Sequence, residues 1–347
     1  MPSTTANVEI ILSLFNKATL FHECAASVYA QSYDDWRCLI IDDGSWDGGA
    51  LLAESIALDI NRFLCLHGAN GGVSRARNMG LDLVSAEYVM FLDGDDTYDP
   101  GICGTMLRQL TEDDSDVCYC GYHWMERGQW LRDVVAASED YILDNPFRHL
   151  LARWLGVETK LFGSVCMGVY RLIIIRQNNI HFHEDIRLAE DMLFNIEYAV
   201  QAHRASLMKA CMYRYMFFDG TLTASYNVNR SAEVDALTTG IRTAMTSYGC
   251  DGDEVSRITA YCRLSSIVGS LTIESRNPAA DAFFSGFRKS VGMLGKDEAR
   301  RLFTLCQDGV WNQLSMASKI KLVVASHAAL RGVFYLYRRI CRRMLVG

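Results

Sequence analysis

Short apolar runs alternate with stretches of helical periodicity over the first hundred residues. The apolar runs have the length of buried strands and lie at residues 8–12, 36–41, 62–66 and 88–92. The helical stretches between them lie at residues 20–30, 50–58 and 71–84. Continuous apolar strands that alternate with helices predict the α/β class, with a mostly parallel sheet that helices cover on both faces.

The pattern is less regular after Pro100. Further strands are predicted at residues 117–121 and 205–217, and further helices at residues 171–177 and 191–202. From about residue 231 the chain is mainly helical to its end. This change predicts a boundary near residues 225–230, between a domain of residues 1–227 and a helical C-terminal region of residues 228–347.

Polar clusters follow three of the four apolar runs. They lie at residues 13–16, 42–45 and 93–96. In open parallel sheets, ligands bind beyond the carboxyl ends of the strands. The sequence therefore predicts that these three clusters form one site at one edge of the sheet.

The third cluster places three carboxylates, Asp93, Asp95 and Asp96, within four residues of an apolar strand. Carboxylate oxygens are ligands that Mg²⁺ and Mn²⁺ prefer, and these cations bridge to phosphate oxygens. Asp and Gly are also common turn residues, so the motif alone fits a solvated turn. Its place beside the other two clusters favours a metal site for a diphosphate-bearing substrate.

Two more segments suit an anionic or hydroxylated substrate. Residues 70–78 form a glycine turn that enters a helix with two arginines, which suits a diphosphate but also fits a capped helix with a solvated basic face. Glu190 and Asp191 begin a predicted helix, where acids also stabilise the helix dipole. A carboxylate base would be useful there for a hydroxylated substrate, since a metal by itself does not deprotonate a hydroxyl group.

Charge is unevenly distributed along the chain. Residues 310–347 hold seven basic residues and no acidic ones, which leaves 27 basic against 41 acidic residues in the rest. A net-acidic body argues against a nucleic-acid partner. Residues 319–344 carry apolar residues at helical spacing, flanked by the basic ones. This suits an in-plane helix on anionic lipid, and it also fits a terminal helix packed on the domain.

The remaining composition predicts a cytoplasmic protein that is peripheral on the cytoplasmic face of the membrane. Twelve cysteines occur without a Cys-x-x-Cys spacing, which favours reduced thiols over disulfides or zinc. Residues 1–7 lack the basic and apolar regions of a secretory signal. No apolar run reaches the length of about 18 residues that a membrane-spanning helix needs.

Taken together, four segments resemble the inverting glycosyltransferases of family 2, which have the GT-A fold. The resemblance rests on the order and spacing of residues 9–16, 39–45, 70–78 and 88–96. Each segment is weak alone, but the four in order are specific, and a fainter resemblance continues to about residue 225. The similar proteins are bacterial transferases of cell-surface polysaccharides.

The resemblance implies a role for each matching residue. Residues 1–100 would bind the nucleotide sugar, with Asp42 on uracil or ribose, Asp95 on the metal, and Asp93 toward ribose or the metal. Residues 101–227 would provide the acceptor side and the base, which is Asp191 with Glu190 in reserve. Arg77 and Asn78 would lie near the nucleotide or brace its pocket. The other implied nucleotide-sugar residues are Ser13, Phe15, Asn16 and Gly94.

The resemblance also implies the reaction and its partners. The donor would be a UDP-hexose or UDP-N-acetylhexosamine, the cofactor Mn²⁺ or Mg²⁺, and the acceptor an oligosaccharide or a lipid-linked glycan. The chain departs from the family where residues 166–168 replace an aromatic residue and a lysine, and where Ser13 replaces a proline. The first departure bears on the preference for donor sugar or acceptor and leaves the metal site untouched.

Two interpretations from other classes remain. Residues 89–97 fit the signature of haloacid-dehalogenase-type phosphatases, in which Asp93 would be a nucleophile and Asp95 an acid/base. That signature usually opens its domain, whereas here a βαβα unit precedes it, and no convincing downstream Ser/Thr, Lys and acidic set follows. The second interpretation is a non-catalytic glycan- or nucleotide-binding module, which the presence of both acidic motifs disfavours.

Overall fold

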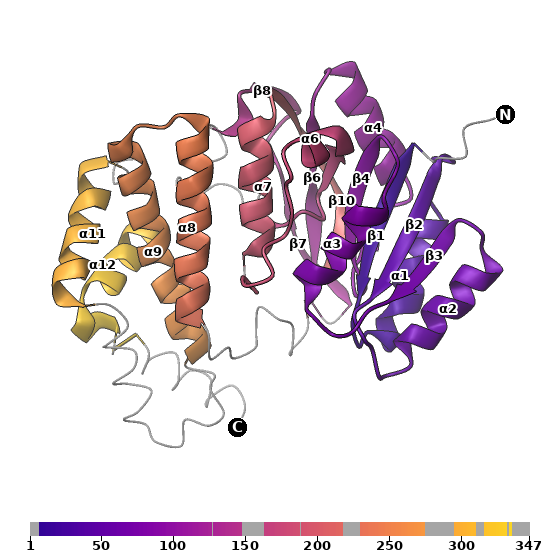
Figure 1. The fold of residues 1–347 in the computed structure, drawn as a ribbon, viewed down its shortest axis with the longest axis horizontal. Helices are drawn as coiled ribbons and strands as arrows, with labels where there is room; N and C mark the ends of the chain where they lie inside the picture. The colour runs from indigo at the N-terminus through magenta and orange to yellow at the C-terminus, as the bar shows by residue number, and fades with distance from the viewer. Residues whose placement is uncertain are drawn as a thin grey trace. The chain divides into compact units, whose positions relative to one another are not determined.

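A computed structural model describes residues 7–126, 128–147, 163–187, 189–217, 230–274, 295–309, 316–331 and 333–334 (Figure 1). The chain divides into two compact units. The described residues up to Phe217 form the first unit, and those from Arg230 onward form the second.

A mixed sheet forms the centre of the first unit, with the strand order β3-β2-β1-β4-β9-β6-β10-β5. The parallel strands are β1 (Val8–Leu14), β2 (Trp36–Asp42), β3 (Phe63–His67), β4 (Tyr88–Asp93), β6 (Val117–Glu126) and β10 (Arg204–Phe217). The antiparallel strands are β5 (Thr97–Tyr98), β7 (Gln129–Val134), β8 (Tyr141–Asp144) and β9 (Gly168–Arg171). The predicted α/β class with a mostly parallel core is confirmed.

Helices cover both faces of this sheet, as Figure 1 shows. Their bounds are α1 Ala18–Tyr29, α2 Gly49–Asp59, α3 Val73–Leu83, α4 Ile102–Glu112, α6 Leu172–Gln177 and α7 Glu190–Gln201. Successive residues of β4 contact opposite layers: Met90 meets Cys103 of α4, whereas Phe91 packs on Phe194 of α7. This explains why β4 is apolar at every position, since both faces of a central parallel strand are buried.

The register of the central strands brings the polar clusters together. Ser13 pairs with Asp93 across β1 and β4, and Leu14 pairs with Asp42 across β1 and β2. Parallel strands end at the same edge of the sheet. The three clusters therefore lie side by side, as the sequence predicted.

The sequence interpretation missed several elements after residue 93. These are α4 and the strands β5, β7, β8 and β9. The strands are two to six residues long, and β7 is exposed at most of its positions. Their place in the sheet depends on pairing with β4, β6 and β10, which local periodicity does not report.

The second unit is helical, as expected. Its described helices are α8 (Arg230–Tyr248), α9 (Gly252–Glu274), α11 (Lys296–Gly309) and α12 (Met316–Ser326), and α9 contacts the other three. None of the helices that the structure describes combines the length and apolar character needed to cross a bilayer.

The predicted basic tail lies only partly within the described residues. In α12, Leu322 and Ala325 are buried, whereas Ile320 is 57% exposed. Arg331 is also buried and donates from Nη1 to the carbonyl oxygen of Ala325 at 2.6 Å. The first half of the tail therefore packs within the helical unit, and residues 335–347, with four of the arginines, lie outside the described part.

Candidate active site

The ends of β1 and β4 are joined by a side chain and by backbone. Ser13 Oγ donates to Asp93 Oδ1 at 2.9 Å, and the Gly94 amide donates to the Ser13 carbonyl oxygen at 2.9 Å. A Cβ on Gly94 would lie 3.0 Å from that same oxygen. Glycine is therefore needed for this close approach, and the Asp93 carboxylate is held at the strand end.

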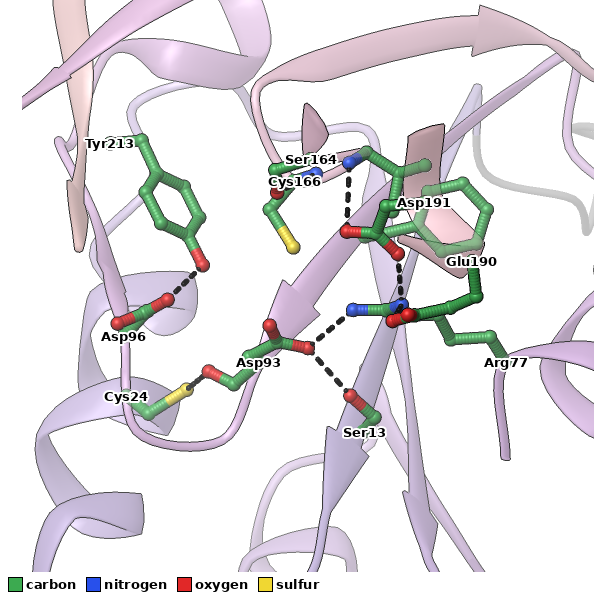
Figure 2. Close-up of polar contacts among 12 residues, drawn as sticks. Ser13, Cys24, Arg77, Asp93, Asp96, Ser164, Cys166, Glu190, Asp191 and Tyr213 are labelled. Atoms are coloured by element: carbon green, nitrogen blue, oxygen red, sulfur yellow. Dashed lines mark hydrogen bonds and ion pairs between the residues drawn. The ribbon is translucent and has the colours of Figure 1, made fainter. Parts of the chain in front are cut away.

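Arg77 of α3 connects three acidic side chains (Figure 2). Its Nη2 donates to Asp93 Oδ1 at 2.8 Å, and its Nη1 pairs with Asp191 and, at 3.3 Å, with Glu190 Oε1. The Arg77 side chain is only 3% exposed. Burial favours the neutral form of arginine, but the three carboxylates outweigh it and raise the pKa of Arg77 further. Arg77 is thus a buried, permanently charged link between the strand end and α7.

Asp191 is fixed from two sides at the start of α7. Arg77 holds one carboxylate oxygen, and the Val165 amide donates to the other at 3.2 Å. The residue before the helix, Ala189, has φ 72°, a left-handed conformation that is uncommon for a residue with a Cβ. This turn directs Glu190 and Asp191 together toward Arg77.

Glu190 and Asp191 are buried next to each other, so burial and their mutual repulsion both affect their pKa values. Desolvation, followed by repulsion from Asp191, raises the pKa of Glu190 to about 8, although Arg77 opposes the shift. Desolvation also raises the pKa of Asp191, and Arg77 again opposes the shift. Arg77 carries one positive charge and faces three acidic side chains, so it offsets only part of their negative charge. Glu190 is therefore protonated near neutral pH, whereas Asp191 forms the closer ion pair with Arg77.

Asp95 and Asp96 have different surroundings although they are adjacent. The Asp95 carboxylate pairs with Lys17 Nζ, and its side chain is 14% exposed. Asp96 is buried, where it accepts hydrogen bonds from the Tyr213 hydroxyl and, at 2.7 Å, from the Met216 amide of β10. Burial and the neighbouring acids raise the pKa of Asp96 well above its ordinary range. Asp96 therefore anchors the loop to β10, whereas Asp95 faces a cation.

The loop after β2 is fastened to the loop after β1. The Asn16 amide donates to Ser45 Oγ at 3.0 Å, and Asn16 Oδ1 accepts from the Trp46 amide at 3.0 Å. The Phe15 and Trp46 rings meet edge to face with centroids 5.1 Å apart, and Trp46 is 77% exposed. These contacts place an aromatic pair at the edge of the sheet beside Asp42.

Asp42 is buried beneath this loop. Its Oδ1 accepts from the Ser45 amide at 3.0 Å, and its Oδ2 lies 3.0 Å from His67 Nδ1. His67 Nε2 lies 2.9 Å from Glu54. The Asp42 carboxylate is thus oriented by its own loop and by β3.

The structure changes the interpretation of the glycine turn at residues 70–78. The amides of Gly71 and Gly72 both donate to the Asp43 carboxylate at 2.8 Å, so these amides are already bonded within the protein. Asn78 exchanges two hydrogen bonds of 2.8 Å with the backbone of Phe182. Arg77 and Asn78 therefore brace this edge of the sheet from α3.

The acidic residues near Lys17 suit a metal that is shared with a diphosphate. The Asp95 carboxylate already faces a cation, and it is partly accessible. Across the described residues, no group of three His, Cys, Asp or Glu side chains is placed to hold a metal. Mg²⁺ in phosphate-binding enzymes is usually held by one or two carboxylates together with phosphate oxygens. Asp95, with Asp93 beside it, fits that arrangement.

The structure brings most of the predicted site residues into two adjoining networks. The first network of hydrogen bonds and ion pairs contains Ser13, Arg77, Asp93, Glu190 and Asp191. The second network links the loops after β1 and β2 and contains Asn16 and Asp42. The networks meet where the Asp43 amide donates to the Leu14 carbonyl oxygen at 2.9 Å.

Sequence reasoning missed three contributors to the site. They are Lys17, the Val165 amide and Tyr213. Lys17 carried a detectable signal, because it directly follows the first polar cluster. The other two contribute through contacts made only in the folded chain. Asp43 lies in the predicted cluster 42–45, but its bonds to the Gly71 and Gly72 amides were not foreseen.

Comparisons with known proteins concern the family and the fold of the chain. Residues 9–174 match the family "Glycosyl transferase family 2". The Escherichia coli protein named "Uncharacterized glycosyltransferase YibD" is 30% identical over 222 residues, which span 62% of each chain. Residues 9–174 are therefore similar to glycosyltransferase family 2, as the sequence motifs indicated.

Solved structures support the fold. TarS of Staphylococcus aureus, in complex with UDP-GlcNAc, superposes with a TM-score of 0.68 at 18% identity, and covers 97% of this chain and 92% of that one. The mannosyltransferase PcManGT of Pyrobaculum calidifontis, with GDP-Man and Mn²⁺, gives a TM-score of 0.53 at 14% identity, with coverage of 97% and 88%. The GT-A fold expected from the sequence is thereby confirmed.

Proposed function

We propose that this chain is an inverting, metal-dependent glycosyltransferase. It transfers a hexose or an N-acetylhexosamine from a UDP-sugar to a hydroxyl group of a glycan. The observation that carries the proposal is the Arg77 network, which joins Asp93 at the end of β4 to Asp191 at the start of α7. Asp93, which we assign to the donor side, and Asp191, which we assign to the acceptor side, thus both bond to the buried guanidinium of Arg77.

The reaction is a single displacement at the anomeric carbon. Asp191 accepts the proton of the acceptor hydroxyl as that oxygen forms its bond to the anomeric carbon. The bond from the anomeric carbon to the β-phosphate oxygen breaks, and its electron pair leaves with UDP. Asp95 and Asp93 would hold a divalent cation, which would supply charge neutralisation for the departing diphosphate.

The charges around Arg77 prepare Asp191 for this role. A base must be ionised before it accepts a proton, and the ion pair with Arg77 favours the ionised form. Glu190 holds a proton near neutral pH because its pKa is raised to about 8. Glu190 therefore limits the negative charge beside Asp191 without competing for the acceptor proton.

The nucleotide side supports a UDP donor. Asp42 and the aromatic pair Phe15 and Trp46 lie beside the ends of β1 and β2, where a planar base and a ribose can be held. TarS, which shares the fold, is described with UDP-GlcNAc. We assign uracil recognition to Asp42 and Phe15, with Asn16 and Ser13 shaping the pocket and Gly94 allowing close approach of the strand ends.

The acceptor is an oligosaccharide or a lipid-linked glycan of surface polysaccharide synthesis. The relatives match over about 62% of their length, so this part of the proposal rests on the site and on the basic C-terminal segment. Four arginines within residues 335–347 would hold the protein on anionic lipid at the cytoplasmic face. Sedimentation with vesicles that contain anionic lipid, before and after Arg→Gln replacement of these four, tests that assignment.

A screen of nucleotide sugars for UDP release, with and without Mn²⁺, tests the proposed reaction. Release that depends on both the metal and a glycan acceptor is expected. UDP binding without any transfer would indicate a non-catalytic binding module. Trapping of a phosphorylated Asp93 would instead indicate a phosphatase, an interpretation that the family match disfavours.

A further inference from the structure

Charge around the strand ends is strongly unbalanced. We define the acidic cluster as Asp93, Asp95, Asp96, Glu190 and Asp191. Within the described residues, ion pairs join this cluster to two basic side chains, Lys17 and Arg77. Glu190 and Asp96 have raised pKa values that favour their neutral forms, but the three other carboxylates still outnumber the two basic side chains. A diphosphate that approaches this edge therefore meets more negative than positive charge.

The Lys17 and Arg77 side chains differ in how freely they can move to a new partner. The Arg77 side chain is 3% exposed and contacts three carboxylates, so it is committed to the protein. The Lys17 side chain is 31% exposed and contacts Asp95 alone among the acidic cluster. An ammonium group on a flexible four-carbon stem can reorient, whereas a buried guanidinium in three ion pairs is fixed.

The backbone of Lys17 is held by several hydrogen bonds, whereas its side chain is held at its ammonium group by Asp95. Its carbonyl oxygen accepts from the amides of Leu20 and Phe21 at 2.9 and 2.8 Å, which fixes the start of α1. Asp47 caps the next amide, that of Ala18, at 2.9 Å. The point from which the ammonium group reaches outward is therefore constant, at the carboxyl end of β1.

We propose that Lys17 stabilises the leaving group in addition to the metal, and that its ammonium group exchanges its partner during the reaction cycle. Its ammonium group pairs with Asp95 when no donor is bound, and it transfers to the donor diphosphate when a divalent cation takes Asp95. This inference rests on the proposed function, because it needs a diphosphate beside Asp95.

The change of partner by Lys17 follows from the charges of the divalent cation and of the donor diphosphate. A divalent cation on Asp95 repels the ammonium group and removes its partner, while the diphosphate of the donor offers a new one. Lys17 then adds a charge-assisted hydrogen bond where negative charge develops as UDP departs. Lys17 should therefore oppose metal binding when the nucleotide is absent and promote nucleotide binding when the metal is present.

Lys17→Met in the full-length protein tests both effects, because methionine keeps the stem and removes the charge. Mn²⁺ affinity without nucleotide, measured by electron paramagnetic resonance of free Mn²⁺, should rise about tenfold. UDP affinity at saturating Mn²⁺, measured by calorimetry, should fall about tenfold, as expected for one lost charge-assisted hydrogen bond. Lys17→Arg should keep UDP affinity within about threefold of the wild type.

Lys209→Met is the matched control. Lys209 is exposed on β10, and only its amide, which bonds to Asp140, has a described contact. This variant should change neither affinity. The proposal stands only if both shifts occur in Lys17→Met, and either shift alone overturns the exchange. Failure of the wild type to bind UDP with Mn²⁺ would instead overturn the proposed function.

Discussion

Arg77 and Asp191, which are 114 positions apart in the chain, form an ion pair that is largely buried. The pair joins the helix that follows β3 to the helix that precedes β10. The same guanidinium bonds to Asp93 at 2.8 Å, so the orientation of the proposed base depends on the end of the central strand. A change at any of these residues should therefore affect both stability and turnover.

Asp191→Asn should separate catalysis from binding. The amide keeps the size of the carboxylate and can still accept from the Val165 amide, but it does not accept a proton from a hydroxyl. Turnover should fall by about 10²–10⁴, the usual contribution of a general base. UDP release assays measure the turnover, and calorimetry should show nearly unchanged UDP affinity. Near-normal turnover would remove Asp191 from this role and direct attention to Glu190.

Arg77→Met should destabilise the fold strongly. It leaves the buried Glu190 and Asp191 and the partly exposed Asp93 near one another without their shared cation. Loss of one partner of a buried ion pair typically costs about 3–5 kcal/mol, and urea unfolding at pH 7 measures this cost. The cost should shrink at pH 5, where the remaining acids protonate more readily.

The control for that change is Arg75→Met on the same helix. Arg75 is exposed and contacts none of the three acids in the described structure. Its replacement should alter the free energy of unfolding by no more than about 0.5 kcal/mol. Equal losses in both variants would show that the ion pairs of Arg77 contribute no more than those of a surface arginine.

Glu190 should make stability fall as the pH rises. Its pKa is about 8 in the folded chain, against an ordinary value of 4.5 that applies once the chain unfolds, so between these values the folded protein binds the extra proton. Stability is then largest below about pH 4.5 with respect to this group, and it is lost progressively up to about pH 8. Urea unfolding between pH 5 and 8.5 should show a flatter dependence for Glu190→Gln than for the wild type. Identical slopes would show that Glu190 is already ionised in the fold.

Asp95 and Asp96 should respond oppositely to substitution. Asp95→Asn should abolish the effect of Mn²⁺ on UDP binding with little change in stability, because it faces a cation at a partly accessible position. Asp96→Ala should lower the free energy of unfolding by about 1–3 kcal/mol, because it leaves the Tyr213 hydroxyl and the Met216 amide without their acceptor. Calorimetry and urea unfolding on both variants check this contrast. Retained Mn²⁺ dependence in Asp95→Asn would assign the metal elsewhere.

The sequence alone determined the parallel strands of the sheet, the edge at which the proposed site lies and most of the acidic residues at that edge. Continuous apolar runs such as residues 88–92 are recognisable because both faces of a central strand are buried, and so every residue of the run is apolar. Parallel strands that end in polar clusters can meet only at one edge, so the grouping of residues 13, 42 and 93 followed without coordinates.

Only the tertiary structure decided how those residues divide their roles. Asp95 and Asp96 are equivalent in sequence, but contact with Lys17 or with β10 separates them. The amides of the glycine turn suited a phosphate until Asp43 was found to occupy them. Periodicity reports which face of an element is buried and leaves open which distant partner meets it. Ion pairs such as that of Arg77 with Asp191 depend on that partner, and so the fold alone assigns them.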